Sequence, residues 1–162
     1  MLRFRSFSIC LLIALCALPA AAKKKGLQNA FYFEYGGNAI LYSLNYDRIL
    51  FKVGDRNFAG ARIGFSWMPF NKQVLDIEHV FIVPMTLNYL YGIAPHYGEL
   101  GLGVAVRTYT DPGIVKTTLF PCISLGYRAR AKGSGTLFRI DFTPVFFKEF
   151  VPWFGFSLVR AF

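Results

Sequence analysis

The 162-residue chain is 54% hydrophobic and 18% aromatic, and it carries a formal net charge of +9. After residue 22 it contains no unbroken apolar run close to the ~20 residues of a membrane-spanning helix, which excludes a helical membrane protein. Its arginines and lysines form no stripe with interleaved aromatic residues, so the positive charge does not indicate a nucleic-acid-binding protein.

The start of the chain has the organisation of a secretory signal peptide. Arg3 and Arg5 precede an apolar run from Phe7 to Leu18, and three alanines follow at positions 20–22. A charged start, a short apolar core and small residues at the end are typical of a cleaved signal. An uncleaved N-terminal anchor is the alternative. We predict a signal peptide over 1–22, a basic tail over 23–29 and one domain over 30–162.

Large and small or polar residues alternate along most of the remaining chain, which indicates β-strands with two different faces. Gly36, Gly37 and Asn38 suit a tight hairpin after the first strand. Eight strands of about ten residues predict an eight-stranded antiparallel up-and-down transmembrane β-barrel, with both termini on one side. The strand patterns cover residues 30–36, 40–47, 58–68, 80–91, 97–109, 117–128, 136–146 and 154–159.

The more polar face of these strands is mostly Gly, Ser, Thr and Asn, with few lysines. A water-facing surface normally carries more charge, whereas small residues suit the interior of a narrow barrel. Charged side chains in such an interior must be paired, so we predict a charge network that plugs the lumen and leaves no open pore. Its expected members are Glu34, Asp47, Arg62, Glu99, Arg107, Arg128, Arg139 and Asp141.

Aromatic residues lie near the predicted strand ends, where membrane barrels carry their aromatic girdles. With both termini in the periplasm, one group lies near the periplasmic rim and a second near the outer rim. The first group is Tyr46, Tyr89, Tyr91, Tyr127 and Phe162, and the second is Tyr35, Trp67, Tyr109 and Trp153.

The last strand carries large apolar residues at alternate positions, namely Phe154, Phe156, Leu158 and the terminal Phe162. This stripe is similar to the C-terminal sorting signal of bacterial outer-membrane barrels, which the barrel-assembly machinery recognises. Arg160 departs from that pattern, although an arginine near the interface can extend its charged group to water.

The mature chain resembles a family of small uncharacterised outer-membrane β-barrel proteins of Gram-negative bacteria. The resemblance implies an integral outer-membrane location and lends no activity. Expected partners are outer-membrane lipid and, during insertion, the barrel-assembly machinery, with no nucleic acid and no identified ligand. The stretches that carry the resemblance are EYGGN (34–38), SLNYDR (43–48), VPMTLNYLYG (83–92), ELGLGV (99–104), PCISLGYR (121–128), LFRIDFTP (137–144) and PWFGFSL (152–158).

The histidines give little indication of catalysis. The chain has two, His79 and His96, and neither has a serine two positions away, the spacing found in lipid A deacylases. We therefore predict no enzyme, no catalytic or metal-binding residues and no cofactor, but a structural or binding role through the outer loops Asn71–His79 and Tyr109–Lys116. The alternatives are a lipid-modifying enzyme that uses His79, and a soluble periplasmic lipocalin-like carrier with an inward apolar face.

Three prolines conflict with a regular closed barrel. Pro84, Pro121 and Pro144 fall inside strand patterns, where proline cannot donate a ladder hydrogen bond. We expect β-bulges near them, or strand ends at other positions.

Overall fold

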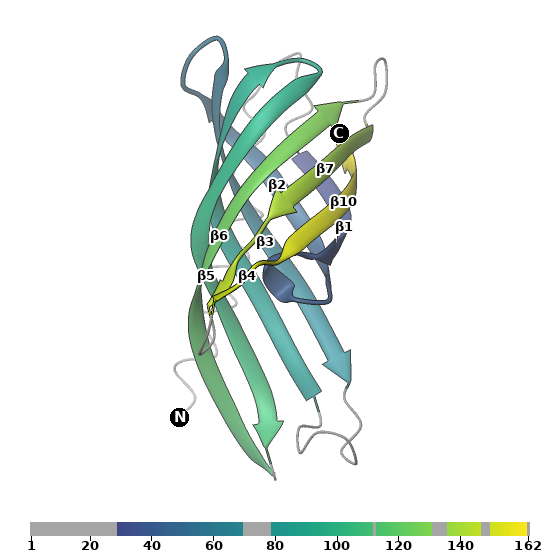
Figure 1. The fold of residues 1–162 in the computed structure, drawn as a ribbon, viewed down its shortest axis with the longest axis vertical. Helices are drawn as coiled ribbons and strands as arrows, with labels where there is room; N and C mark the ends of the chain where they lie inside the picture. Colours follow the sequence, from purple (N-terminus) through teal and green to yellow (C-terminus); the bar gives the residue numbers. More distant parts are fainter. Residues whose placement is uncertain (1–28, 70–78, 112, 131–135, 147–149, 162) are drawn as a thin grey trace.

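The computed structural model describes residues 29–69, 79–111, 113–130, 136–146 and 150–161. Eight strands form a closed antiparallel barrel in the order β1-β10-β7-β6-β5-β4-β3-β2, which confirms the predicted fold class (Figure 1). Among the described residues, no helix is both long enough and apolar enough to cross a membrane. The barrel strands are β1 (Asn29–Gly36), β2 (Tyr42–Lys52), β3 (Asn57–Pro69), β4 (His79–Ile93), β5 (His96–Asp111), β6 (Ile114–Arg130), β7 (Thr136–Phe142) and β10 (Phe154–Ala161).

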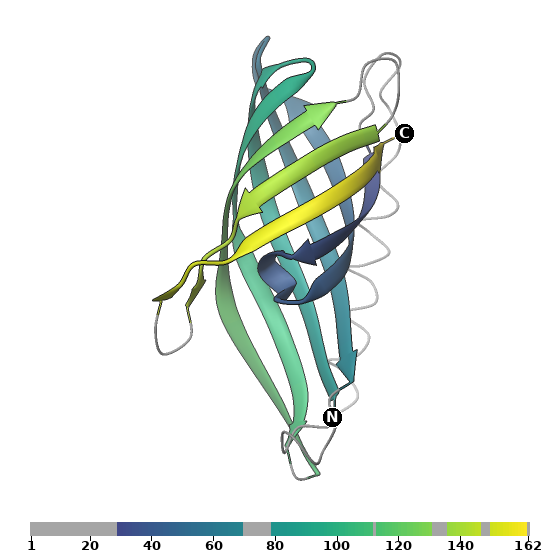
Figure 2. The ribbon, with the colours of Figure 1, turned by 45° about the vertical axis from the view of Figure 1, so that its right-hand side comes forward.

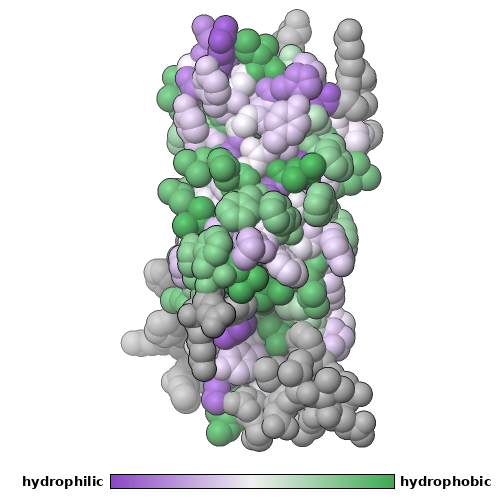
Figure 3. Space-filling model, in the orientation of Figure 1, coloured by the Kyte–Doolittle hydropathy of each residue, from purple (hydrophilic) through white to green (hydrophobic). Residues whose placement is uncertain are grey.

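Side chains alternate between a buried inner face and an exposed outer face along the barrel strands. On β2, for example, Leu44 is 63% exposed, whereas the neighbouring Ser43 and Asn45 are buried. Figure 3 shows hydrophobic side chains gathered in a band across the middle of one face of the barrel. Most of the large apolar side chains therefore point outward, the reverse of the arrangement in a soluble carrier.

The first barrel strand starts and the last barrel strand finishes at the same opening of the barrel, because Ala30 of β1 pairs with Ala161 of β10. We call this the terminal end, and it also holds the β2–β3 and β4–β5 turns. The opposite, distal end holds the β5–β6 turn. Figures 1 and 2 show the terminal end at the top.

The barrel wall is much longer on one side than on the other. β4, β5 and β6 have 15, 16 and 17 residues, whereas β7 and β10 have 7 and 8. Pairing of β6 with β7 runs from Leu125↔Phe142 to Arg130↔Leu137, so the distal part of β6 extends past β7. Figures 1 and 2 show β3 to β6 continuing beyond the short strands. Pro121 lies in this extension, where β6 pairs with β5 and is beyond the pairing with β7.

The β1–β2 connection is not the expected tight hairpin. It contains a single 3-10 turn, η1 (Gly37–Ala39), followed by Ile40 with a positive φ of 77°. The three η1 residues are buried, and Ala39 packs with Met68 and Cys122 on the concave face of the long wall. The turn thus folds into the distal mouth of the barrel rather than extending from it.

A short hairpin, β8 (Val145–Phe146) and β9 (Phe150–Val151), interrupts the chain between β7 and β10 and projects from the barrel side in Figure 2. Pro144 lies between β7 and β8, so it is accommodated by a strand end, one of the two expected solutions.

Pro84 lies inside β4 without a bulge, so the expectation of a bulge there is wrong. The β3–β4 register is the same on either side of it, at Ile63↔Met85 and Ser66↔Ile82. Gly64, opposite Pro84 across β3, leaves the room that the ring requires, because a Cβ there would lie 2.9 Å from Pro84 Cγ.

Candidate functional site: the charged lumen and the distal end

The inner face of the barrel gathers charged side chains from six strands. Seven of the eight residues expected in the lumen are at most 5% exposed. Alternation accounts for this placement, because each lies two positions along a strand from other inward residues. The seven are Glu34 on β1, Asp47 on β2, Arg62 on β3, Glu99 on β5, Arg128 on β6, and Arg139 and Asp141 on β7.

Glu99 joins two arginines that face each other. Arg128 and Arg139 are directly paired across β6 and β7, an arrangement in which like charges repel. Glu99 Oε2 accepts a hydrogen bond from Arg128 Nε and lies 3.2 Å from Arg139 Nε. Arg128 also contacts Asp47 through Nη2, and Arg139 Nε lies 2.7 Å from Asp141 Oδ2. One carboxylate thus separates two guanidinium groups that each hold a further carboxylate.

Tyr32 connects this group to a second ion pair. Its hydroxyl accepts hydrogen bonds from Arg62 Nη1, at 3.3 Å, and from Arg139 Nη1. Arg62 Nη1 lies 3.5 Å from Glu34 Oε1, and Arg62 Nε donates to Thr86 Oγ1 at 3.1 Å. Tyr32 was not among the expected lumen residues, although it shares the inner face of β1 with Glu34.

Glycines on the inner face lie directly against buried carboxylate side chains, at positions where any other residue would crowd them. A Cβ at Gly126 would lie 1.9 Å from Asp141 Oδ1, and one at Gly155 would lie 3.1 Å from Glu34 Oε1. The small residues of the inner face therefore make room for the charged side chains of the cluster.

Arg107, the eighth expected member, lies nearer the distal end of β5 than Glu99 does. It is eight residues beyond Glu99 on β5, or about 26 Å at the usual rise per residue, which is too far for the two side chains to meet. It is half-buried, donates to Thr118 Oγ1 at 3.3 Å, and places its guanidinium 5.1 Å from the centre of the Tyr109 ring. Tyr109 accordingly lies on the concave inner face, beside the cluster that contains Cys122.

The distal segments differ from the expected loops. The segment Tyr109–Lys116 is largely strand, because β5 continues to Asp111 and β6 begins at Ile114, so the expectation of a loop there is wrong. Of the segment Asn71–His79, residues 71–78 lie outside the described residues, and His79 begins β4.

Both histidines lie on the outer face, among aromatic residues. The His79 ring is 6.2 Å from the Trp67 ring at the distal side. The His96 ring stacks on Tyr127 at 5.9 Å at the terminal end, and its Nδ1 is hydrogen-bonded to the Tyr127 hydroxyl. Within the described residues, no group of three His, Cys, Asp or Glu side chains is arranged to hold a metal ion.

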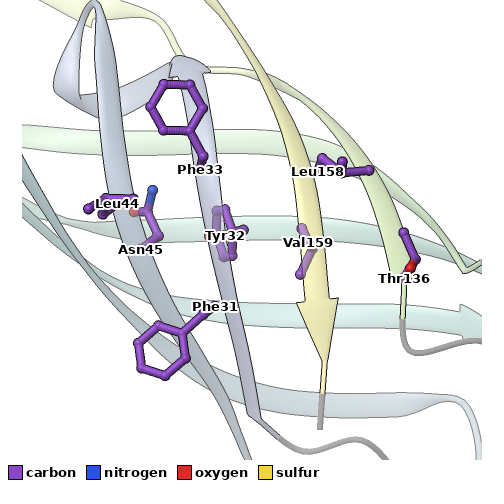
Figure 4. Close-up of a pocket in the computed structure, with 8 residues that line it drawn as sticks. All are labelled: Phe31, Tyr32, Phe33, Leu44, Asn45, Thr136, Leu158 and Val159. Atoms are coloured by element: carbon purple, nitrogen blue, oxygen red, sulfur yellow. The ribbon is translucent and has the colours of Figure 1, made fainter.

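The expected sorting stripe lies on the outer face where the structure describes it. Phe154, Phe156 and Leu158 are 52%, 47% and 67% exposed, whereas Phe162 and the Arg160 side chain lie outside the described part. Leu158 also borders a groove of about 540 Å³ over β1. Figure 4 shows Phe31 and Phe33 beside this groove, with Tyr32 between them along the strand.

The expected girdle residues lie near the two ends, with two differences of orientation. Tyr109 faces inward, as described above, and Trp153 donates from Nε1 to the Ile40 carbonyl at 2.8 Å, which ties the η1 connection to the start of β10. The other described members are on the outer face, namely Tyr46, Tyr89, Tyr91 and Tyr127 near the terminal end, and Tyr35 and Trp67 toward the distal end.

Comparison with known proteins identifies the fold. No protein-family model and no curated protein sequence matches the chain. Two solved structures of Ail, the attachment invasion locus protein of Yersinia pestis, are similar. One is 12% identical with a TM-score of 0.46, and the other, in complex with the heparin analogue sucrose octasulfate, is 8% identical with a TM-score of 0.50. Each match covers 83% of this chain and 93% of Ail. The closed barrel and the match with a TM-score of 0.50 together give the chain the fold of a small eight-stranded outer-membrane β-barrel.

Proposed function

We propose that this protein is an integral outer-membrane barrel with a sealed lumen and no enzymatic activity, whose role is structural or is to bind a partner at its distal end. Export by a signal peptide over 1–22 and insertion by the barrel-assembly machinery belong to the same proposal. The exposed apolar band of the outer face supports a lipid environment. A closed barrel is suited to that environment, because it satisfies all the backbone hydrogen bonds of its strands without water.

The buried ion network is the observation that carries the sealed lumen. Arg128 reaches across the barrel from Glu99 to Asp47, so its side chain crosses the path that a solute would take. The η1 turn then covers the distal side of this layer with Ala39. An eight-stranded barrel is only wide enough for its side chains to fill.

A binding role is favoured over catalysis by the position of the histidines. His79 and His96 lie on the outer face against aromatic rings, whereas the polar cluster is inside. The long strands β4 to β6 meanwhile present a concave surface at the distal end, with Arg107 on it. Such a surface can contact a partner outside the cell without any opening through the barrel.

The test has two parts. Protein expressed with its own signal is fractionated and run on a gel with and without heating; a folded barrel stays in the outer membrane and migrates faster unheated. Purified protein is then added to a planar lipid bilayer, where we expect no stepwise conductance. The control is Arg128→Ala, which removes the side chain that crosses the lumen and is expected to conduct. Steady channels from the unaltered protein would contradict the sealed lumen, and recovery in the soluble periplasm would contradict the location.

The enzyme alternative is tested separately. Cells that express His79→Ala are compared with cells that express the unaltered protein, by mass spectrometry of lipid A and phospholipids. We expect identical lipid masses, since His79 contacts an aromatic ring of the outer face. A lipid species that depends on His79 would overturn the non-enzymatic assignment.

A further inference from the structure

The outer face of the long wall carries a groove of about 330 Å³ between two rows of side chains. Neighbouring strands pair so that each row runs across β2, β3, β4 and β5. The row nearer the terminal end is Arg48, Ala61, Leu87 and Leu102, and the next row is Tyr46, Ile63, Met85 and Val104.

The groove is hollow because a small residue stands among large ones. Ala61 lies directly between Arg48 and Leu87, and its methyl group leaves the floor low. At roughly the volume of a water molecule, about 30 Å³, per methylene group, the groove holds on the order of ten methylenes. That is the size of a substantial part of one lipid acyl chain.

The charged end of the groove lies at the level of the lipid headgroups. Arg48 pairs with Asn29, the first residue of β1, so it is level with the terminal end of the short strands, four residues before β2 ends. Two residues before it, the Tyr46 hydroxyl donates to Asn29 Oδ1 at 2.8 Å, as expected of an aromatic girdle residue at the interface. The groove thus begins beside a guanidinium group at the headgroup level and continues into the apolar band.

A register shift between Ile49 and Phe51 lies immediately beside Arg48. Such bulges redirect neighbouring side chains, and here Leu50, inside the irregular segment, also lines the groove. The groove over β1 described above has no charged residue in its lining, so the two grooves differ in the feature that recognises a headgroup.

We propose that this groove binds one glycerophospholipid of the leaflet at the terminal end, with its phosphate on Arg48 and an acyl chain over Ala61. The proposal rests on the membrane location proposed above. A planar guanidinium binds phosphate oxygens with two parallel hydrogen bonds, which gives a fixed headgroup position. An apolar groove that continues from that position accepts the chain of the same molecule.

The experiment measures lipid retained by the folded barrel in native mass spectrometry after transfer from bilayers to detergent. The probes are phosphatidylglycerol, diacylglycerol without phosphate, lipid A, and inorganic phosphate. We expect one phosphatidylglycerol to remain bound and the other three probes to be lost. A charged hydrogen-bonded contact contributes enough that Arg48→Gln should weaken retention about tenfold or more. Ala61→Phe, which fills the floor of the groove, should also weaken it.

The matched control is Arg56→Gln, which removes an exposed arginine of the β2–β3 turn at the same end of the barrel. Each variant is first shown to be folded by its faster migration in an unheated gel. This gel separates the two proposals. If Arg48→Gln is folded and inserted in the membrane but retains as much phosphatidylglycerol as the unaltered protein, the lipid-binding proposal is overturned and the barrel assignment stands. If Arg56→Gln lost as much bound phosphatidylglycerol as Arg48→Gln, the effect would be one of general charge and the groove would be refuted. Retention of lipid A alone would overturn the choice of lipid. A mass equal to two protein chains, abolished by Ala61→Phe, would assign the groove to a second copy of the protein.

Discussion

Replacing Arg139 with glutamine tests whether the buried charges stabilise one another. Arg139 is fully buried, and its Nε lies 2.7 Å from Asp141 Oδ2 and 3.2 Å from Glu99 Oε2. In Arg139→Gln, Glu99 keeps its contact with Arg128, but Asp141 loses the guanidinium beside it. The variant therefore leaves a carboxylate buried without that compensating charge.

The expected cost follows from that geometry. Removing one partner of a buried ion pair lowers the free energy of unfolding by about 3–5 kcal/mol, because the remaining charge keeps its desolvation penalty. At 1.4 kcal/mol for each factor of ten, the folding equilibrium constant falls by about two to three and a half orders of magnitude. Adding Asp141→Asn, which has the same shape without the charge, should recover most of the loss.

The assay is urea unfolding of protein folded into lipid vesicles, followed by tryptophan fluorescence and by gel migration without heating. Arg56→Gln again serves as the control, since an exposed turn position should change the free energy of unfolding by less than about 0.5 kcal/mol. Two results would show that the contacts of Arg139 do not stabilise the barrel. One is that Arg139→Gln unfolds at the same urea concentration as this control. The other is that the double variant with Asp141→Asn unfolds at a lower urea concentration than Arg139→Gln alone.

Two further predictions concern packing. Gly64→Ala should lower the free energy of unfolding by about 1–3 kcal/mol in the same assay, because its Cβ would lie 2.4 Å from Asn45 Oδ1. Gly98→Ala is the control, because its Cβ would meet the Tyr91 carbonyl oxygen at an ordinary 3.7 Å. Equal free energies of unfolding for the two variants would refute the steric argument. Cys122, 3% exposed, should react with a maleimide on the order of a hundredfold more slowly in the folded barrel than in urea, and immediate labelling would show that η1 does not keep it covered.

The alternation of side chains was enough to predict the barrel strands and their two faces. It predicts Leu44 outside and Asn45 inside, because successive side chains of a strand point to opposite faces, so one face meets lipid and the other meets the lumen. Tyr109 shows where the prediction departed from its own rule. It was assigned to a girdle by its level near a strand end, yet it has the same parity as Arg107 and therefore faces inward.

The remaining features depend on contacts between distant segments, which no local pattern contains. The inward fold of η1 rests on packing of Ala39 against β3, β4 and β6, residues far away in sequence. The ion pair of Asp47 is likewise with Arg128 across the lumen, although Arg62 is its direct neighbour in the sheet. Alternation thus separates inner-face from outer-face residues, while the three-dimensional arrangement determines which of them meet.

The unequal wall has a consequence for the surrounding bilayer. At the usual rise and a tilt of about 40°, the 8 residues of β10 span about 20 Å along the membrane normal and the 16 residues of β5 about 40 Å. The apolar band of a membrane barrel is about 25 Å tall, so lipid beside β7, β10 and β1 must become thinner while lipid beside β3 to β6 need not. The protein would therefore deform the membrane on one side only, gather shorter or more disordered chains there, and give any neighbouring barrel a preferred side of approach.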